Sequence, residues 1–331
     1  MEYPSYTYPV SSLRVGSSLG NFYTFARLSA DTDLKGLWSA IDDQYYLGEW
    51  NIDLFIDGIK LEAHSTEFNP ESQETRYGEG HIDVRKRFVL PFSTGRRSQQ
   101  FPSRLQAAIF TIRFTNRSSL AKQLNIRHAL VFPARLSELF IKQPPPDQCA
   151  KRVDIHPREG RFEIRTTGKP GEARIVGSPL ASRKHLVSDE TLIVEYSLSA
   201  EPGKTVEAPF VLAYSGAGVE SAHKIYLQCQ HSNDVANESI SEYKKLLSRS
   251  DLLTPNPMIN RGVRWAKVNT VRVQHKYRTG EAFTNDPPQD IVVIRDLAWY
   301  AFGSDYITPE FSANTLSIAE RHAFHENGKL T

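Results

Sequence analysis

Apolar and polar residues alternate along several stretches in the first two thirds of the chain. From Trp50 to Ile56 every second residue is apolar, and Asn51 and Asp53 lie between. Successive side chains of a strand point to opposite faces, so this pattern predicts a strand with one buried face. The same pattern predicts further strands at residues 82–88, 108–114, 126–132, 192–198 and 206–214.

Turn signals separate these predicted strands. Asp57-Gly58 follows one of them directly, and this pair is typical of a type I′ hairpin turn, in which both central residues need a positive φ. Residues 144–147 and 168–171 are rich in proline and glycine. Many strands with turns and no interleaved helices indicate an antiparallel β-sandwich, and its length indicates one larger than an immunoglobulin-like domain.

The pattern changes near residue 232 to helical spacing. Helices are predicted at residues 233–250, from Pro257 to a stop at Gly280, at 296–302, and from Thr308 as N-cap toward Gly328. The predicted organisation is a β-sandwich at residues 1–231, a linker helix at 232–256 and a helical part at 257–331. The last helix would need a partner for its apolar stripe, which indicates either docking on the sandwich or a larger helical domain that continues.

Composition narrows the classes of function. The 331 residues are 40% hydrophobic and 24% charged with a net charge of +2, which fits a globular protein and predicts no nucleic-acid partner. The short basic run Arg85-Lys86-Arg87 is expected to face solvent. No apolar run spans a bilayer and the start lacks a leader pattern, so no membrane partner and a cytoplasmic location are expected. Cys149 and Cys229 form neither a disulfide framework nor a zinc site.

One loop followed by a helix carries the best candidate chemistry. Residues 283–290 are polar, a short apolar run follows, and then come Arg295 and Asp296. A helix N-terminus favours a carboxylate, so Asp296 has a plain alternative role as the capping or first-turn acid. His322 and His325 are expected to face solvent and not to bind a metal. Residues 216–218, Gly-Ala-Gly, are not expected to join a strand to a helix as a dinucleotide site requires.

The helical part resembles the six-hairpin glycosidase superfamily, in particular glucoamylase-like and glycogen-debranching-like enzymes. The resemblance covers roughly the last 80 residues, and the sandwich fits it by architecture alone. It rests on Trp265-Ala266-Lys267-Val268-Asn269, Tyr277-Arg278-Thr279-Gly280, Arg295-Asp296-Leu297-Ala298-Trp299, Pro309-Glu310-Phe311 and Glu326-Asn327-Gly328-Lys329. It implies a mainly β fold, in which an N-terminal antiparallel β-sandwich is followed by the first helices of an (α/α)6 toroid.

The resemblance also implies roles for particular residues. In glucoamylase-like members an Arg-Asp pair binds sugar hydroxyls in the −1 subsite, and Arg295 and Asp296 match it. Trp299, one turn further along, is a candidate to present its ring to a sugar, with core packing as the alternative. Glycoside hydrolysis usually needs two carboxyl groups. The family takes both from later helices, so the catalytic acid and base are expected beyond Thr331.

The sequence therefore predicts a glycoside hydrolase, truncated within its catalytic domain, that acts on an oligo- or polysaccharide such as an α-glucan. Asp286, Asp290 and Glu310 are carboxylates in the same region, but none is assigned as the general acid. Neither a metal nor an organic cofactor is expected. The alternative is a non-catalytic carbohydrate-binding or interaction protein built on the sandwich. The sugar, the linkage, inversion or retention, and the oligomeric state stay open.

Overall fold

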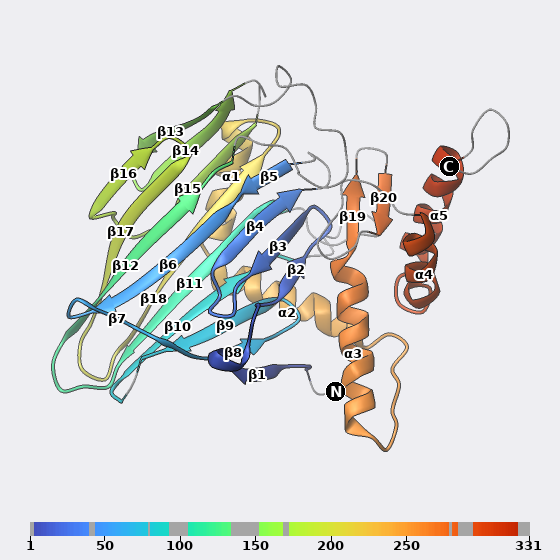
Figure 1. The fold of residues 1–331 in the computed structure, drawn as a ribbon, viewed down its shortest axis with the longest axis horizontal. Coiled ribbons are helices and arrows are strands. Elements are labelled where there is room, and N and C mark those ends of the chain that lie inside the picture. Colours follow the sequence, from blue (N-terminus) through green and yellow to red (C-terminus); the bar gives the residue numbers. More distant parts are fainter. Residues whose placement is uncertain are drawn as a thin grey trace.

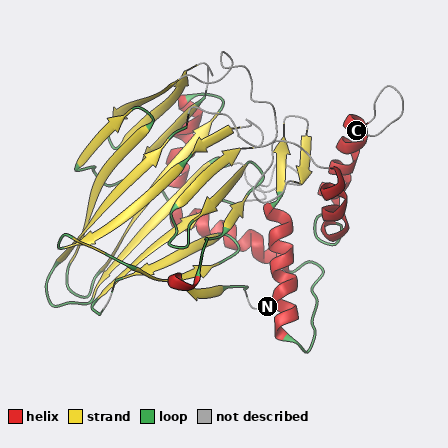
Figure 2. Ribbon diagram, viewed as in Figure 1, coloured by secondary structure: helices red, strands yellow, loops and turns green. Residues whose placement is uncertain are grey.

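The computed structural model describes residues 3–39, 44–78, 80–92, 105–133, 152–167, 172–277, 280–283 and 294–323. Two large antiparallel sheets stack face to face, and helices lie on the outer side of one sheet and beside one end of the stack (Figures 1 and 2). The predicted mainly β sandwich followed by helices is confirmed. No helix in the described residues is long and apolar enough to cross a membrane.

In the part of the chain that the structure describes, the first sheet has nine strands, and η1 (Val10–Ser12) is a short 3-10 helix after its first edge strand. The spatial order is β1 (Tyr6–Pro9), β8 (Ala63–Phe68), β9 (Ser72–Tyr77), β10 (Ile82–Val89), β11 (Ala107–Asn116), β18 (Thr205–Ser215), β15 (Ala173–Gly177), β14 (Arg161–Thr167) and β13 (Arg152–Arg158).

The second sheet follows the order β16 (Lys184–Ser188), β17 (Thr191–Ala200), β12 (Lys122–Val131), β6 (Glu49–Ile56), β4 (Leu34–Ser39), β3 (Thr24–Leu28) and β2 (Ser18–Gly20). β5 (Gln44–Leu47) pairs with β4, and β7 (Ile59–Lys60) pairs with β6. The predicted Asp57-Gly58 hairpin is confirmed, because it joins β6 to β7 with φ values of 52° and 79°.

Aromatic side chains from the two sheets meet in the core. Trp50 of β6 contacts Phe110 of β11 with ring centroids 4.8 Å apart, and the Tyr46 and Tyr214 rings stack at 4.0 Å. All four side chains are buried. Contacts between offset or edge-on rings add to the hydrophobic free energy of burial, so they help to hold the sheets together.

The prediction that Arg85-Lys86-Arg87 faces solvent is wrong for Lys86. The run lies in β10, where Arg85 and Arg87 point outward and Lys86 points into the sandwich with no exposed surface. Its Nζ atom lies 2.7 Å from the carboxylate of Asp33, which precedes β4 in the other sheet, and 5.2 Å from the ring centre of Tyr77. A buried ammonium must have such partners. Lys86 points inward because the side chains of a strand alternate between its two faces, and Arg85 and Arg87 take the outer face.

Five helices follow or cover the sandwich in the described residues: α1 (Val219–Cys229), α2 (Ser232–Leu247), α3 (Pro257–Arg272), α4 (Ile294–Ser304) and α5 (Pro309–Ala323). α1 was not predicted. It packs Ala222 and Tyr226 against the outer face of β11, β15 and β18. Gly218 is its N-cap, so the Gly-Ala-Gly segment does join a strand to a helix, but within an antiparallel sheet.

The helix predicted to run to Gly280 ends earlier. α3 stops at Arg272, and a hairpin of β19 (Gln274–Tyr277) and β20 (Gly280–Phe283) follows. The N–H of Lys276 donates to the carbonyl of Phe22 at 2.9 Å, so the sandwich provides a hydrogen-bond partner that sequence periodicity does not contain. Cys229 is a free, buried thiol, whereas Cys149 lies outside the described residues.

We expect Lys86→Met to lower the free energy of unfolding by about 3–5 kcal/mol, because Asp33 would keep a largely buried charge without its cation. Urea unfolding followed by circular dichroism measures the change. Lys122→Met is the matched control, since its partner Asp57 has 63% of its side chain exposed. The control should cost about 0–1 kcal/mol. Equal losses in the two variants would contradict the assigned role of Lys86.

Two buried histidines make stability depend on pH. Burial lowers the pKa of His128 and of His275 to about 3, against about 6.5 in an unfolded chain. Between these values the unfolded state binds protons that the folded state does not, so the free energy of unfolding falls as the pH drops below about 6.5. Each histidine contributes a slope of about 1.4 kcal/mol per pH unit.

Denaturant titrations between pH 4.5 and 8 measure this slope. His128→Gln should remove one histidine's share of it, and His64→Gln, at an exposed position of β8, should leave it unchanged. A wild-type slope that His128→Gln does not reduce would show that His128 binds a proton in the folded state.

Candidate functional site

The candidate site lies on α4, the helix that carries the residues matched to the sugar-binding pair. Leu297 and Ala301 are buried and form the inner side of this helix. Leu297 packs in a cluster with Phe22 of the sandwich, Phe283 of β20 and Phe311 of α5. Because one stripe of α4 is buried in this way, the residues between these positions face outward.

Arg295, which is exposed, and Asp296, which is partly buried, form an ion pair in the first turn of α4. The Nε atom of Arg295 lies 3.1 Å from Oδ1 of Asp296, and 81% of the Arg295 side chain is exposed against 26% for Asp296. An ion pair this exposed contributes little to stability. Asp296 does occupy the first helical turn, as its plain alternative role requires. Both side chains are nevertheless accessible to a ligand.

Trp299 is exposed on the described surface, as a ring that contacts a ligand must be. Its exposed fraction is 71%, and those of Phe302 and Tyr306 are 70% and 73%. The Trp299 and Phe302 ring centroids are 6.0 Å apart with the planes at 52°. Arg295, Trp299 and Phe302 follow the spacing i, i+4 and i+7 along α4, so they form one row that we call the α4 aromatic row, and Tyr306 lies in the turn that follows the helix. Large aromatic side chains gathered on a surface mark an interaction site.

A pocket with a volume of about 440 Å³ lies at the end of the α4 aromatic row. Asp305, Tyr306 and Glu310 line it together with Arg249 and Ser250 from the end of α2. The Arg249 guanidinium donates to the carbonyl of Ile307 at 3.1 Å, and the Ser250 hydroxyl donates to that of Tyr306 at 2.6 Å. These hydrogen bonds hold the pocket wall to α2.

Sequence reasoning considered Glu310 but missed Asp305, Phe302 and Tyr306. The signal for Phe302 was present, since its i+3 spacing from Trp299 places it on the same face of α4, whereas Tyr306 lies in the turn after the helix. Among the other considered residues, Asp286, Asp290 and His325 lie outside the described residues, and His322 lies in α5. The described residues contain no group of three or more His, Cys, Asp or Glu side chains placed to hold a metal ion.

α3 connects this helical surface to the sandwich. Its last residue, Arg272, is largely buried and donates to the carbonyls of Asn69 and Pro70 at 3.1 and 2.9 Å. Lys267 donates to the carbonyls of Leu247 and Arg249 at the end of α2. Lys267, one of the residues that carry the family resemblance, thus has a structural role in joining two helices.

No protein-family model matches the chain, and no curated protein matches its sequence. In structure the chain is similar to a protein from the human microbiome provisionally named a kojibiose phosphorylase. The TM-score is 0.55 at 12% identity, over 84% of this chain and 43% of that one. The chain thus spans less than half of that protein, and at this identity the similarity shows a shared fold.

A second similar structure is an Escherichia coli K12 protein provisionally named an aldose 1-epimerase. The TM-score is 0.37 at 12% identity, over 64% of this chain and 99% of that one. This score is too low to support an argument about function or site.

We expect Gly20→Ala to weaken the junction between α3 and the sandwich. A Cβ atom on Gly20, in β2, would overlap the main chain of Arg272, and such overpacking costs about 1–3 kcal/mol of unfolding free energy. Gly262→Ala in α3 is the matched control, because its Cβ would meet no atom within 4 Å and alanine favours a helix by up to about 1 kcal/mol. Thermal and urea unfolding should change in opposite directions in the two variants; a stabilising Gly20→Ala would contradict the close approach.

Proposed function

We propose that this protein is a carbohydrate-active enzyme of the six-hairpin glycosidase kind, and that the described chain supplies its sandwich, its first toroid helices and a saccharide-binding surface. The observation that carries the proposal is the α4 aromatic row. It combines ring faces with a guanidinium and a carboxylate at one end and a pocket with two further carboxylates at the other.

The chemistry of this surface suits a saccharide. A sugar presents apolar C–H faces that pack on aromatic rings, and hydroxyl groups that donate to carboxylates and accept from guanidinium groups. The row from Arg295 to Phe302 is roughly 10 Å long at the rise of an α-helix, and Tyr306 and the pocket extend it. This length favours an oligosaccharide over a single sugar.

The fold similarity supports the same proposal. A match over 84% of the chain extends beyond residues 1–231, which are 70% (231 of 331) of the sequence, and so reaches into the helices. The similar protein's name describes a phosphorylase. Phosphorolysis and hydrolysis of a glycosidic bond differ in whether phosphate or water attacks the sugar, so both reactions belong to the proposal.

In this proposal Arg295 and Asp296 bind hydroxyls of the sugar and Trp299 stacks on its ring. The general acid, and the base of a hydrolytic reaction, come from later helices, as the family resemblance implies. Asp305 and Glu310 line the pocket and contribute hydrogen-bond acceptors to the saccharide there. Residues 1–331 alone are expected to bind the saccharide without turning it over.

The first test is Trp299→Ala, with binding measured by calorimetry against maltooligosaccharides, kojibiose, rhamnosides and β-glucosides. We expect the wild type to bind one class and the variant to bind it at least about tenfold more weakly, a loss of about 1.4 kcal/mol. Tyr8→Ala, an aromatic residue of β1 that is 44% exposed, should leave binding unchanged. Both variants should keep their unfolding midpoint, since the two positions are on the surface.

Binding that survives loss of Trp299, or the absence of binding to all four classes, would reject the saccharide surface. Assays of the longer parent protein with and without phosphate then separate the two reactions, because phosphorolysis yields a sugar phosphate only when phosphate is present. A parent that binds the saccharide and cleaves nothing under either condition would support the non-catalytic binding alternative.

A further inference from the structure

A row of arginines crosses the outer face of the first sheet, far from α4 in sequence. Arg85 of β10 lies directly opposite Arg113 of β11 on one side and Arg76 of β9 on the other. Like charges directly opposite each other destabilise a sheet. Three adjacent guanidinium groups therefore need negative charge close to them.

The described carboxylates compensate two of these arginines. Arg76 pairs with Asp83 at 3.0 Å, and Arg85 pairs with Glu74 at 3.3 Å and with Asp83 at 3.7 Å. Arg113 is exposed and forms no ion pair with any described residue. Glu207 of β18 lies directly opposite Arg113, and its Oε1 atom accepts a hydrogen bond from the neutral side-chain amide of Asn233 at 3.0 Å, which leaves the carboxylate charged.

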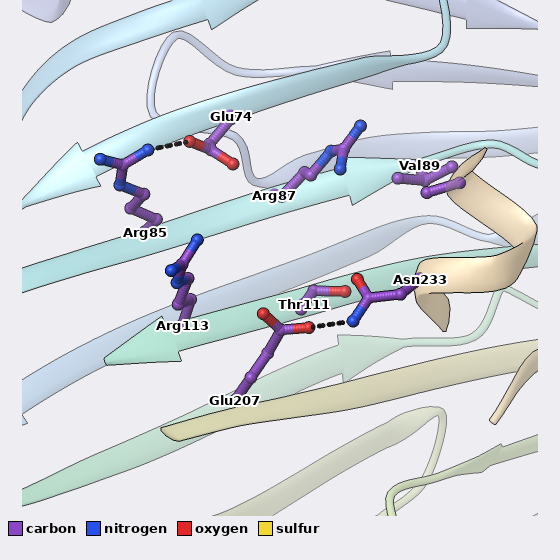
Figure 3. Close-up of a pocket in the computed structure, with 9 residues that line it drawn as sticks. Glu74, Arg85, Arg87, Val89, Thr111, Arg113, Glu207 and Asn233 are labelled. Carbon is purple, nitrogen blue, oxygen red and sulfur yellow. Dashed lines mark hydrogen bonds and ion pairs between the residues drawn. The ribbon is translucent and has the colours of Figure 1, made fainter. Parts of the chain in front are cut away.

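Arg113, which forms no ion pair with a described residue, lies in a hollow. Arg85, Arg87 and Arg113 line it with Thr111, Glu74 and Glu207, and Asn233 and Ala236 from the first turns of α2 close one side (Figure 3). Its volume is about 110 Å³, which suits one small charged group. The lining carries three guanidinium groups and two carboxylates, and both carboxylates already accept hydrogen bonds.

We propose that this hollow binds a single oxyanion group, the phosphate or carboxylate of a small ligand. Arg113 donates to its oxygens, and Arg85 and Arg87 line the same hollow. No residue of α4 or α5 lines the hollow, so the site is independent of the proposed saccharide surface. An anionic ligand there would relieve the repulsion between Arg85 and Arg113.

The test uses the full chain with the substitution Arg113→Gln, which removes a charge at an exposed strand position. Calorimetry with inorganic phosphate, glucose 1-phosphate, glucuronate and glucose is carried out at constant ionic strength set with chloride. We expect saturable binding of at least one anion and none of glucose at this site, and at least tenfold weaker anion binding in Arg113→Gln. Phosphate and glucuronate separate the two sources of the oxyanion group.

Two further variants keep the test decisive. Arg27→Gln removes an exposed arginine from β3 of the other sheet and should leave anion binding unchanged. Arg113→Lys keeps the charge but loses the planar fork, and should bind with intermediate affinity. In chloride buffer Arg113→Gln should unfold at the same temperature as the wild type or higher, because a repulsion has been removed.

Three results would overturn the proposal: no saturable binding of any of the three anions by the wild type, equal anion affinity in Arg113→Gln and the wild type, or a lower unfolding temperature of Arg113→Gln in chloride. The last result would give Arg113 a structural role.

Discussion

The buried charge of Lys86 constrains how the two sheets pack. The Lys86 ammonium crosses the sandwich interior from β10 to Asp33, whose carboxylate also accepts from the N–H of Ile52 at 3.0 Å. A buried ion pair is weak evidence of net stabilisation, but either charge without its partner costs several kcal/mol. The two sheets can therefore pack only in arrangements that bring Lys86 to Asp33. The same ammonium contributes, after burial itself, to lowering the pKa of the neighbouring His128.

The position of the helical surface is set by contacts between the second sheet and the hairpin β19–β20. Phe25 and Trp38, on β3 and β4, pack against Tyr277 and Ala282 of the hairpin β19–β20, and Phe22 continues this contact to α4 and α5. These contacts use one stripe of α4 for packing, which leaves the α4 aromatic row accessible. A row on a helix that is packed along its inner side is a more rigid platform than the same residues on a loop would be.

The sequence predicted the elements whose evidence is local. The strand at residues 50–56, the Asp57-Gly58 turn and the helices that begin near residue 232 and at Pro257 each depend on spacing or on one turn residue. The two wrong predictions involve contacts between residues that are far apart in the sequence. Strand alternation places Lys86 inside, but its partner Asp33 lies 53 positions away, and β19 forms where helical spacing continues because Phe22 supplies a hydrogen bond. The same distinction applies to the candidate site. Helical spacing could have predicted the row on α4, whereas the pocket forms only where the end of α2 contacts the turn between α4 and α5.

The net charge of +2 illustrates a limit of composition as evidence. Averaged over 331 residues it predicts no partner that is a polyanion such as nucleic acid, because such a partner needs many cations over a wide area. It does not apply to a small anion, because such a ligand interacts with the few charges that lie within hydrogen-bonding distance. Strand pairing sets those charges: it brings Arg76, Arg85 and Arg113 side by side although they are separated in sequence. Register, and not composition, therefore decides whether this sheet attracts an anion.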